Sequence, residues 1–217
     1  MTERPPVLAR RALLACAAAP LLAACSRKQK MQALPAGSPV LALGDSLTYG
    51  TGASPEASYP AVLARLTGWN VVNAGIPGDT AGGALARLPD LLRQHQPQLV
   101  IVSIGGNDFL RRVSPAQTRA NVRSICEQAA ASGAQVLLVA IPELSALAAA
   151  TRSLGDHPLY EEVAAELKLP VHARGWARVL GDDALRSDAV HANARGYEAF
   201  ATGLAERARE LGLAAGA

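Results

Sequence analysis

From residue 39 onward, short apolar runs alternate with longer stretches in which apolar residues recur every three or four positions. The apolar runs predict strands at 40–43, 71–73, 99–104 and 136–141, with a short further strand near 170–172. The runs at 99–104 and 136–141 are continuously apolar, which is typical of strands buried on both faces of a parallel sheet.

The stretches between the strands have helical spacing. They predict helices at 59–66, 80–95, 115–131, 159–167 and from about 193 onward. Ser114 to Gln117 forms a capping box with proline at the first helical position, and Gly133 suits the far end of that helix. Pro89 lies inside the second helix and should kink or divide it.

Repeated strand and helix units imply an α/β fold. We expect a three-layer α/β/α sandwich around a flavodoxin-like parallel sheet of about five strands. The sequence shows no internal repeat and no boundary, so residues 38–217 are expected to form one domain. Parallel strands end at one edge of the sheet, where such folds place their sites, so the loops at 44–50, 74–79, 105–113 and 185–192 should converge.

The first 24 residues predict an export signal rather than part of the fold. Three arginines, at positions 4, 10 and 11, precede an apolar run over 12–24 that is too short to cross a bilayer comfortably. The adjacent pair at 10 and 11 is a weak indication of twin-arginine export.

The signal ends in Leu22-Ala23-Ala24-Cys25, which resembles the lipobox of bacterial lipoproteins. The resemblance implies cleavage before Cys25 and attachment of a diacylglyceryl group to its thiol. A plain secretory signal with an incidental cysteine is the alternative. Residues 25–37 are polar and contain proline and glycine, as expected of a tether between lipid and domain.

Composition limits the classes of function. Aromatic residues make up only 4% of the chain, so we expect a core of Leu, Val, Ile and Ala. Removal of residues 1–24 takes away three of the 21 basic and one of the 18 acidic side chains, which leaves a net charge of about +1. Nucleic-acid binding has no support, because the sequence has no basic stripe with interleaved aromatics. Cys126 would be the remaining free thiol, too few for a disulfide or a thiolate metal cluster.

The four loops expected to converge carry four short motifs. These are Gly44-Asp45-Ser46-Leu47, Asn73 to Thr80 (NAGIPGDT), Gly105-Gly106-Asn107-Asp108 and Asp188-Ala189-Val190-His191. In this order they resemble the four blocks of the GDSL or SGNH hydrolase family over nearly the whole mature domain. Residues 41–50, 78–97 and 105–111 look especially like its exported bacterial thioesterase, lysophospholipase and arylesterase branch. The resemblance implies hydrolysis of carboxylic esters and thioesters without a metal or cofactor.

Ser46 is the expected nucleophile, because a strand end followed by a helix start projects its hydroxyl into the cleft. A serine at such a junction is also a common helix N-cap, which is the alternative. The resemblance makes His191 the base that takes the Ser46 proton and Asp188 the group that orients the imidazole. Asp188 and His191 could instead be a metal pair or a loop brace, although no further ligands cluster beside them.

Acyl transfer also requires donors for the tetrahedral oxyanion. The resemblance assigns this role to the backbone N–H groups of Ser46 and Gly78 and to the Asn107 side chain. Gly78 could be only a turn residue, and Asn107 only a left-handed loop residue. The family often has proline after the histidine, and Ala192 stands there instead, which should make this loop less rigid. Asp45, Asn73 and Asp108 are expected to brace loops.

A substrate groove is expected directly after Asn107. Phe109, Leu110 and Val113 would line an acyl groove, while Arg111 and its neighbour Arg112 would face the anionic or zwitterionic part of a lipid. Two adjacent arginines on a solvated face are the alternative.

The sequence therefore predicts a lipid-anchored serine esterase that forms an acyl-enzyme on ester or lipid substrates. We expect export to the periplasmic side of a bacterial membrane, attachment through Cys25, no cofactor and a monomer; Ser26 after the cysteine favours the outer membrane. A carbohydrate O-acetylesterase of the same fold and a non-catalytic lipoprotein binding domain are the alternatives. A nucleotide-binding domain is disfavoured, because no phosphate-cradling glycine loop follows the first strand.

Overall fold

The structure, a computed structural model, describes residues 1–2, 31–143 and 154–214. The predicted signal, Cys25 and residues 25–30 of the predicted tether lie outside the described residues. The strands are β1 (Pro39–Gly44), β2 (Asn70–Gly75), β3 (Leu99–Ser103), β4 (Gln135–Val139) and β5 (Val171–His172). They form one parallel sheet in the order β2-β1-β3-β4-β5, which confirms the predicted flavodoxin-like arrangement.

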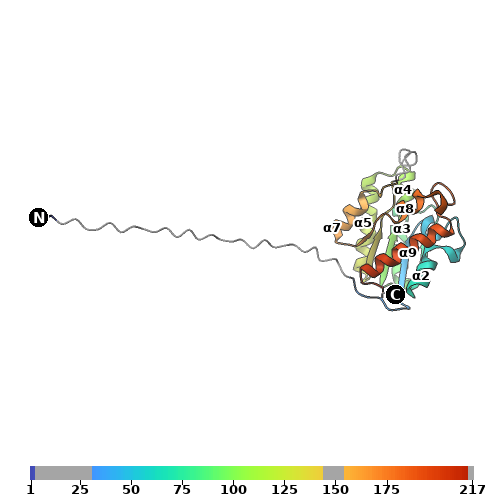
Figure 1. Cartoon of the computed structure of the whole chain (residues 1–217), viewed down its shortest axis with the longest axis horizontal. Helices are drawn as coiled ribbons and strands as arrows, with labels where there is room; N and C mark the ends of the chain where they lie inside the picture. Colours follow the sequence, from blue (N-terminus) through green and yellow to red (C-terminus); the bar gives the residue numbers. More distant parts are fainter. Residues whose placement is uncertain (3–30, 144–153, 215–217) are drawn as a thin grey trace.

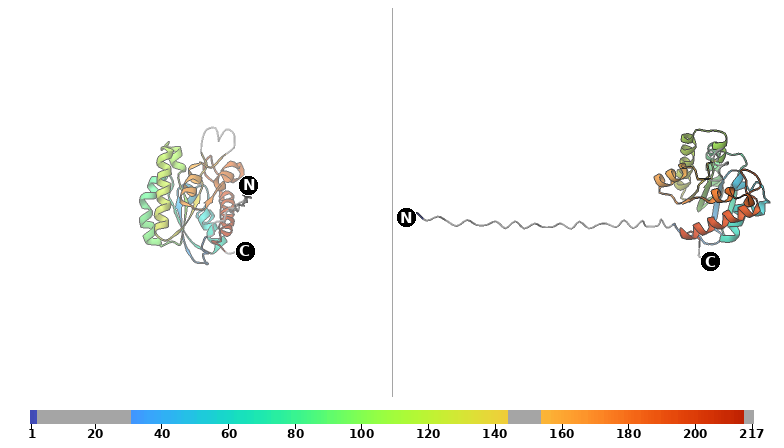
Figure 2. Two further views of the ribbon diagram at one scale, coloured as in Figure 1. Left: turned by 90° about the vertical axis from the view of Figure 1, so that its left-hand side faces the viewer. Right: turned by 45° about the horizontal axis from the view of Figure 1, so that its top comes forward.

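Helices cover both faces of the sheet, which gives the predicted α/β/α sandwich (Figures 1 and 2). One layer consists of α3 (Ala81–His95), α5 (Pro115–Ala131) and α7 (Leu159–Leu167). The other consists of α2 (Tyr59–Thr67), α8 (Gly175–Gly181) and α9 (Ala194–Glu210). Four short elements lie in the loops: α1 (Ser46–Tyr49), α4 (Gly106–Leu110) and the 3-10 turns η1 (Pro55–Ala57) and η2 (Asp183–Leu185).

The helix boundaries follow from local capping. Ser114 accepts a hydrogen bond from the Gln117 N–H at 3.2 Å and starts α5 at the predicted position. Pro89 does not divide α3, which runs unbroken from Ala81 to His95. The helix continues because it packs on both sides of the proline: Ala84 and Leu88 before it are fully buried, and Leu91 and Leu92 after it pack against the core. This packing outweighs one missing backbone hydrogen bond.

The core is aliphatic around the sheet and aromatic in one helix layer. β3 is fully buried along its length, as its sequence predicts. Between the sheet and α9, however, the rings of Trp176 and Phe200 stack with centroids 3.7 Å apart, and Tyr59 packs edge-on against both. The expectation of a core without large rings is therefore wrong for this layer, where the few aromatic residues gather.

Three buried tyrosines hold the loops at the edge where the strands end. The Tyr197 hydroxyl donates to the Thr51 carbonyl at 2.7 Å, and the Tyr160 hydroxyl donates to the Ile104 carbonyl at 2.8 Å. The Tyr59 hydroxyl shares a hydrogen bond with Thr48 at 3.2 Å. Because a buried hydroxyl is costly without a partner, these bonds fix the loops relative to the helices beneath them.

Residues 31–38 lie against the opposite edge of the sheet, where the strands begin. The N–H groups of Met31 and Leu34 donate to the carbonyls of Leu211 and Leu213, each at 2.8 Å, and the Leu34 side chain is buried. The Gln135 side chain exchanges two hydrogen bonds with the backbone of Gln32. The chain therefore enters the domain at the end away from α4, which marks the upper edge in Figure 1. Within the described ranges, no helix is long and apolar enough to cross a membrane.

Candidate active site

The four motif loops meet at the edge of the sheet where the strands end. Ser46 starts α1, two residues after the end of β1, and Asn107 lies in α4, just beyond β3. In the observed strand order, β1 and β3 flank the point where successive connections leave in opposite directions, which is where doubly wound sheets bind ligands. Ser46, Gly78, Asn107 and His191 all line one cleft of about 320 Å³.

Ser46, His191 and Asp188 form a continuous hydrogen-bonded line. The Ser46 Oγ lies 3.0 Å from the His191 Nε2, and the His191 Nδ1 lies 2.8 Å from the Asp188 Oδ2. A proton on Nδ1, donated to the carboxylate, leaves Nε2 free to accept the serine proton. Ser46 and His191, which are 145 positions apart in sequence, therefore meet with Asp188 in the geometry required of a nucleophile, its base and an orienting acid.

Ser46 is not the N-cap of its helix. Asp45 takes that place, with its Oδ1 accepting a hydrogen bond from the Leu47 N–H at 3.0 Å. The Ser46 hydroxyl is therefore left for His191, and its side chain remains partly accessible from the cleft.

The loop that carries His191 is braced without a proline at position 192. The Asp188 Oδ1 accepts hydrogen bonds from the N–H groups of Val190 and His191, both at 2.8 Å, and an antiparallel bridge joins Arg186 to Ala192. Ala192 is fully buried. These contacts constrain the loop, which the sequence predicts to be less rigid.

Three residues that carry hydrogen-bond donors line the same cleft: Ser46, Gly78 and Asn107. Gly78 has φ +79° in a tight turn in which the Asp79 N–H donates to the Ile76 carbonyl at 3.0 Å, a conformation that favours glycine. Gly78 is therefore a turn residue, and it also lines the cleft. Within the described part of the chain, the backbone N–H groups of Gly78 and Ser46 have no hydrogen-bond acceptor. The third donor, the Asn107 amide, is held by the Asp79 carbonyl at 2.9 Å.

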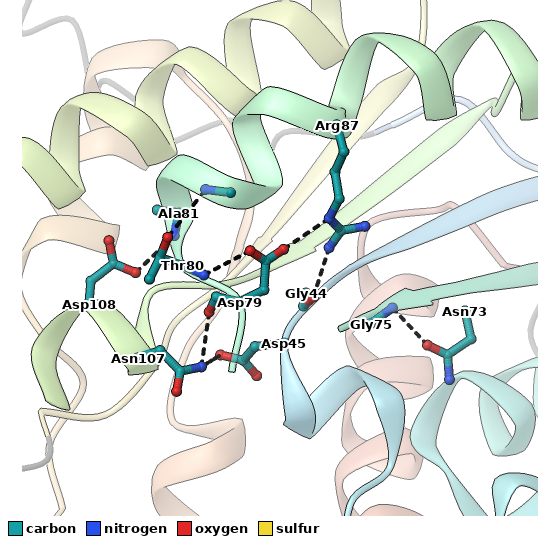
Figure 3. Close-up of polar contacts among 11 residues, drawn as sticks. Gly44, Asp45, Asn73, Gly75, Asp79, Thr80, Ala81, Arg87, Asn107 and Asp108 are labelled. Carbon is teal, nitrogen blue, oxygen red and sulfur yellow. Dashed lines mark hydrogen bonds and ion pairs between the residues drawn. The ribbon is translucent and has the colours of Figure 1, made fainter. Parts of the chain in front are cut away.

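Carboxylates and one arginine form a network of polar contacts around Asn107 and the residues next to Ser46 and Gly78 (Figure 3). Asp79 pairs with Arg87 of α3, and the Asp45 Oδ2 lies 3.4 Å from the Asn107 amide nitrogen. The Asp108 Oδ2 accepts from the Ala81 N–H at 2.8 Å, at the start of α3. Asp45 and Asp108 thus brace the loops, as predicted. The parts played by Asp79 and Arg87 were not predicted; Asp79 lies inside the second motif, but nothing in the sequence singles out Arg87.

Asn73 also braces a loop. Its side chain accepts from the Gly75 N–H at 3.0 Å and donates to the Tyr49 carbonyl at 3.3 Å, which joins the end of β2 to the end of α1.

Of the residues expected to form the substrate groove, Leu110 lines the cleft, whereas Phe109 and Arg111 do not. Leu110 lines the cleft and is 51% exposed. Phe109 instead stacks on His157 with centroids 4.5 Å apart, and Arg111 donates to the Gly78 carbonyl at 2.8 Å. Further apolar residues line the cleft: Leu47, Pro77, Ile141, Pro142, Leu180 and Val190. Leu47, Pro77 and Val190 belong to the motifs themselves. Ile141, Pro142 and Leu180 are separated from them in sequence, so only the folded chain reveals these three.

The charge states of two carboxyls differ because their surroundings differ. Complete burial raises the pKa of Asp45 to about 7, despite the Leu47 N–H bond that acts to lower it. For Asp188, burial also acts to raise the pKa, but the hydrogen bonds from His191 and Val190 outweigh it and bring the pKa below its ordinary value. Asp188 is therefore ionised at neutral pH, as a partner for an imidazolium must be.

The other histidines have different surroundings. Burial lowers the pKa of His172 to about 4, so it stays neutral inside the fold. His157 accepts the Leu159 N–H at 3.2 Å near the start of α7. Among the residues that the structure describes, no group of three His, Cys, Asp or Glu side chains is placed to hold a metal ion.

A serine, an imidazole and a carboxylate in line at this edge of a doubly wound sheet are typical of serine hydrolases. Residues 42–199 match the GDSL-like Lipase/Acylhydrolase family, and the chain belongs to that family. It is therefore a GDSL-type hydrolase that acts on ester bonds.

The similarity extends to named relatives. The chain is 36% identical over 177 residues to Thioesterase 1/protease 1/lysophospholipase L1 of Escherichia coli strain K12, covering 79% of this chain and 84% of the relative. It is 39% identical over 126 residues to Esterase TesA of Pseudomonas aeruginosa, a match that spans 56% of this chain and 63% of that protein. A crystal structure of TesA superposes with a TM-score of 0.70 at 31% identity, covering 79% of this chain and 98% of that one.

Asp45 gives a prediction for stability against pH. The buried carboxyl keeps its proton to about pH 7, whereas the unfolded chain loses it near the ordinary pKa of 3.8, so the free energy of unfolding falls as pH rises between these values. Asp45→Asn keeps an acceptor for the Leu47 N–H and removes this titration. Relative to the wild type, the free energy of unfolding of the variant should rise by about 1.4 kcal/mol per unit between pH 5 and 6.

Urea unfolding at several pH values measures this difference. Asp90→Asn, at a side chain that is 76% exposed on α3, is the control for loss of a carboxylate. A difference between Asp45→Asn and the wild type that stays constant from pH 4 to 7 would show that Asp45 is ionised in the fold.

Proposed function

We propose that this chain is an exported serine esterase that hydrolyses acyl and aryl esters, and thioesters, through an acyl-enzyme on Ser46. One observation carries the proposal: the Ser46 Oγ lies 3.0 Å from the His191 Nε2, whose ring is held by Asp188 at 2.8 Å. Three hydrogen-bond donors lie on the same cleft, where a substrate carbonyl oxygen would develop negative charge.

In the first half-reaction, the Ser46 Oγ attacks the ester carbonyl carbon while its proton passes to the His191 Nε2. The tetrahedral oxyanion accepts hydrogen bonds from the Ser46 and Gly78 N–H groups and from the Asn107 amide. Asp188 stabilises the imidazolium through the 2.8 Å bond to Nδ1. The carbon–oxygen bond to the leaving group then breaks, and the leaving alcohol takes the proton from Nε2, which leaves the acyl group on Ser46.

In the second half-reaction, water replaces the alcohol. His191 takes a proton from the water as its oxygen attacks the acyl carbon, and the same donors receive the second oxyanion. Collapse of this intermediate breaks the bond to Oγ, returns the proton from Nε2 to Ser46 and releases the carboxylic acid. The protein groups end in their starting protonation states.

The cleft supports an apolar acyl or aryl group as substrate. Its lining includes Leu47, Leu110, Ile141, Leu180 and Val190, with few polar groups other than those of the site itself. Relatives with the printed names esterase, thioesterase, lysophospholipase and arylesterase support the same substrate class.

We further propose that the mature chain begins at Cys25 as a lipoprotein on the periplasmic side of a bacterial membrane. The lipobox-like Leu22-Ala23-Ala24-Cys25 supports this. So does the path of residues 31–38, which join the domain at the edge where the strands begin, away from the cleft. An anchor there would leave the cleft open to solvent.

Loss of the nucleophile gives the first test. Ser46→Ala should lower kcat on p-nitrophenyl esters by about a thousandfold or more, because the acyl-enzyme cannot form. His191→Ala should do the same, and a double variant should be no slower than either single one, since the two groups act as a unit. Stopped-flow or plate assays with acetyl, butyryl and octanoyl esters measure the effect and the chain-length preference together.

Ser132→Ala, at an exposed serine at the end of α5, is the matched control and should keep full activity. A wild type that hydrolyses none of these esters would favour a non-catalytic binding domain. Activity confined to the acetyl ester would favour an O-acetylesterase.

Replacement of the proposed lipidation site gives the second test. In a cell expressing the full chain, Cys25→Ser should move the protein from the membrane fraction to the soluble fraction, because no acyl chains would anchor it. Esterase activity per molecule should stay within about twofold, because residues 31–38 join the domain at the edge of the sheet away from the cleft. Fractionation and activity assays check both. A wild-type chain that is already soluble after export would support a plain secretory signal.

A further inference from the structure

The three donors proposed to receive the oxyanion belong to three separate segments. Ser46 follows β1, Gly78 lies in the turn after β2, and Asn107 belongs to α4. A donor set of this kind works only if the segments keep a fixed spacing, because a displacement of about 1 Å can cost about a hundredfold in rate. The side chain of Arg87 contacts two of these segments directly and reaches the third through one residue.

Arg87 lies on α3, in the first half of the helix, and points toward the end of the sheet (Figure 3). Its Nη2 donates to the Gly44 carbonyl at 3.0 Å, two residues before Ser46. Its Nε donates to the Asp79 Oδ2 at 2.9 Å, one residue after Gly78. The arginine side chain is 21% exposed and the aspartate 12% exposed, so solvent screens this pair less than a surface pair.

Asp79 connects Arg87 to Asn107, because its carboxylate bonds to the first and its backbone carbonyl to the second. Its carbonyl oxygen accepts the Asn107 amide at 2.9 Å, while its Oδ1 accepts the Thr80 N–H at 2.9 Å. The position of Asp79 is tight, since a Cβ at Gly83 would lie 2.0 Å from the Asp79 Oδ1. The Asp79 carboxylate is therefore held between Arg87 and the first turn of α3, and its carbonyl is held with it.

We propose that Arg87 is a positioning residue for ester hydrolysis: its guanidinium ties Gly44 to Asp79 and thereby sets the spacing of the Ser46 N–H, the Gly78 N–H and the Asn107 amide. The inference rests on the proposed acyl transfer at Ser46. Arginine suits this task because its planar fork donates in two directions at once, whereas a lysine ammonium cannot reproduce that geometry. Arg87 does not line the cleft, so it acts through the donors and not on substrate.

The test is a double-mutant cycle between Arg87 and Asn107 on a p-nitrophenyl ester. Arg87→Met, which keeps the stem and removes the fork, should lower kcat by about tenfold to a hundredfold with KM within about threefold. Asn107→Ala should lower kcat by about a hundredfold or more. In the Asn107→Ala background, Arg87→Met should cost less than it does in the wild type, because one of the three donors whose spacing Arg87 sets is already gone.

Arg93→Met is the matched control. Arg93 lies on the same helix and pairs with Asp90, but its side chain is 74% exposed, so activity should change less than about twofold. Arg87→Lys should have a kcat between those of the wild type and Arg87→Met. If urea unfolding shows that Arg87→Met does not fold, Arg87→Lys takes its place in the cycle.

Two results would overturn the inference. One is full activity of a folded Arg87→Met variant. The other is an equal loss of kcat from Arg87→Met in the wild-type and Asn107→Ala backgrounds, which would show that Arg87 does not set the position of the Asn107 amide. An inactive wild type would instead refute the proposed function on which the inference rests.

Discussion

The close packing of α1 against the end of β1 is the constraint on which the site depends. Gly44 is paired with Gly75 on one side and with Ser103 on the other, so the strand end has no lateral freedom. A Cβ at Gly44 would lie 2.1 Å from the Thr48 Oγ1 and 2.4 Å from the Ser103 carbonyl oxygen. Only glycine lets the chain turn directly from strand into helix at this point, and that turn places the Ser46 hydroxyl before His191.

The same packing also determines how much negative charge the carboxyls near the proposed oxyanion donors carry. Three carboxyl residues, Asp45, Asp79 and Asp108, contact Asn107 or the start of α3 next to the proposed oxyanion donors, and full negative charge on all three would oppose an oxyanion there. Burial raises the pKa of Asp45 to about 7 and that of Asp108 above its ordinary value. Asp79 is paired with Arg87 instead. The fold thus limits the negative charge behind the donors, while Asp188 on the other side of His191 stays ionised.

Much of the fold and of the arrangement of the candidate site could be predicted from the sequence, because both rest on local signals. Apolar runs and helical spacing gave the strands and the long helices, and the four motifs fell on loops that the parallel sheet brings together. Short helices such as α4 and α8 have too few residues for a periodic pattern, so they were not predicted; α1 was expected only as a helix start at Ser46. The aromatic layer around Trp176 and Phe200 also escaped prediction, since composition cannot show where a few rings gather.

What the sequence could not supply are contacts between distant residues. The composition of residues 31–37 predicts a tether, yet Leu34 is buried and bonded to Leu213, far along the chain. Phe109 follows the third motif directly but stacks on His157 across the edge of the sheet. Arg87 lies amid an ordinary amphipathic helix, and only its distance to Gly44 reveals a part in the site.

The central claim is that His191 activates Ser46, and covalent labelling tests it most directly. A fluorophosphonate reacts with a serine only when a neighbouring base removes its proton, so the wild type should take up one equivalent, which peptide mapping should locate on Ser46. His191→Ala should label at least about a hundredfold more slowly. Labelling at another residue, or equal rates in the wild type and His191→Ala, would contradict the account.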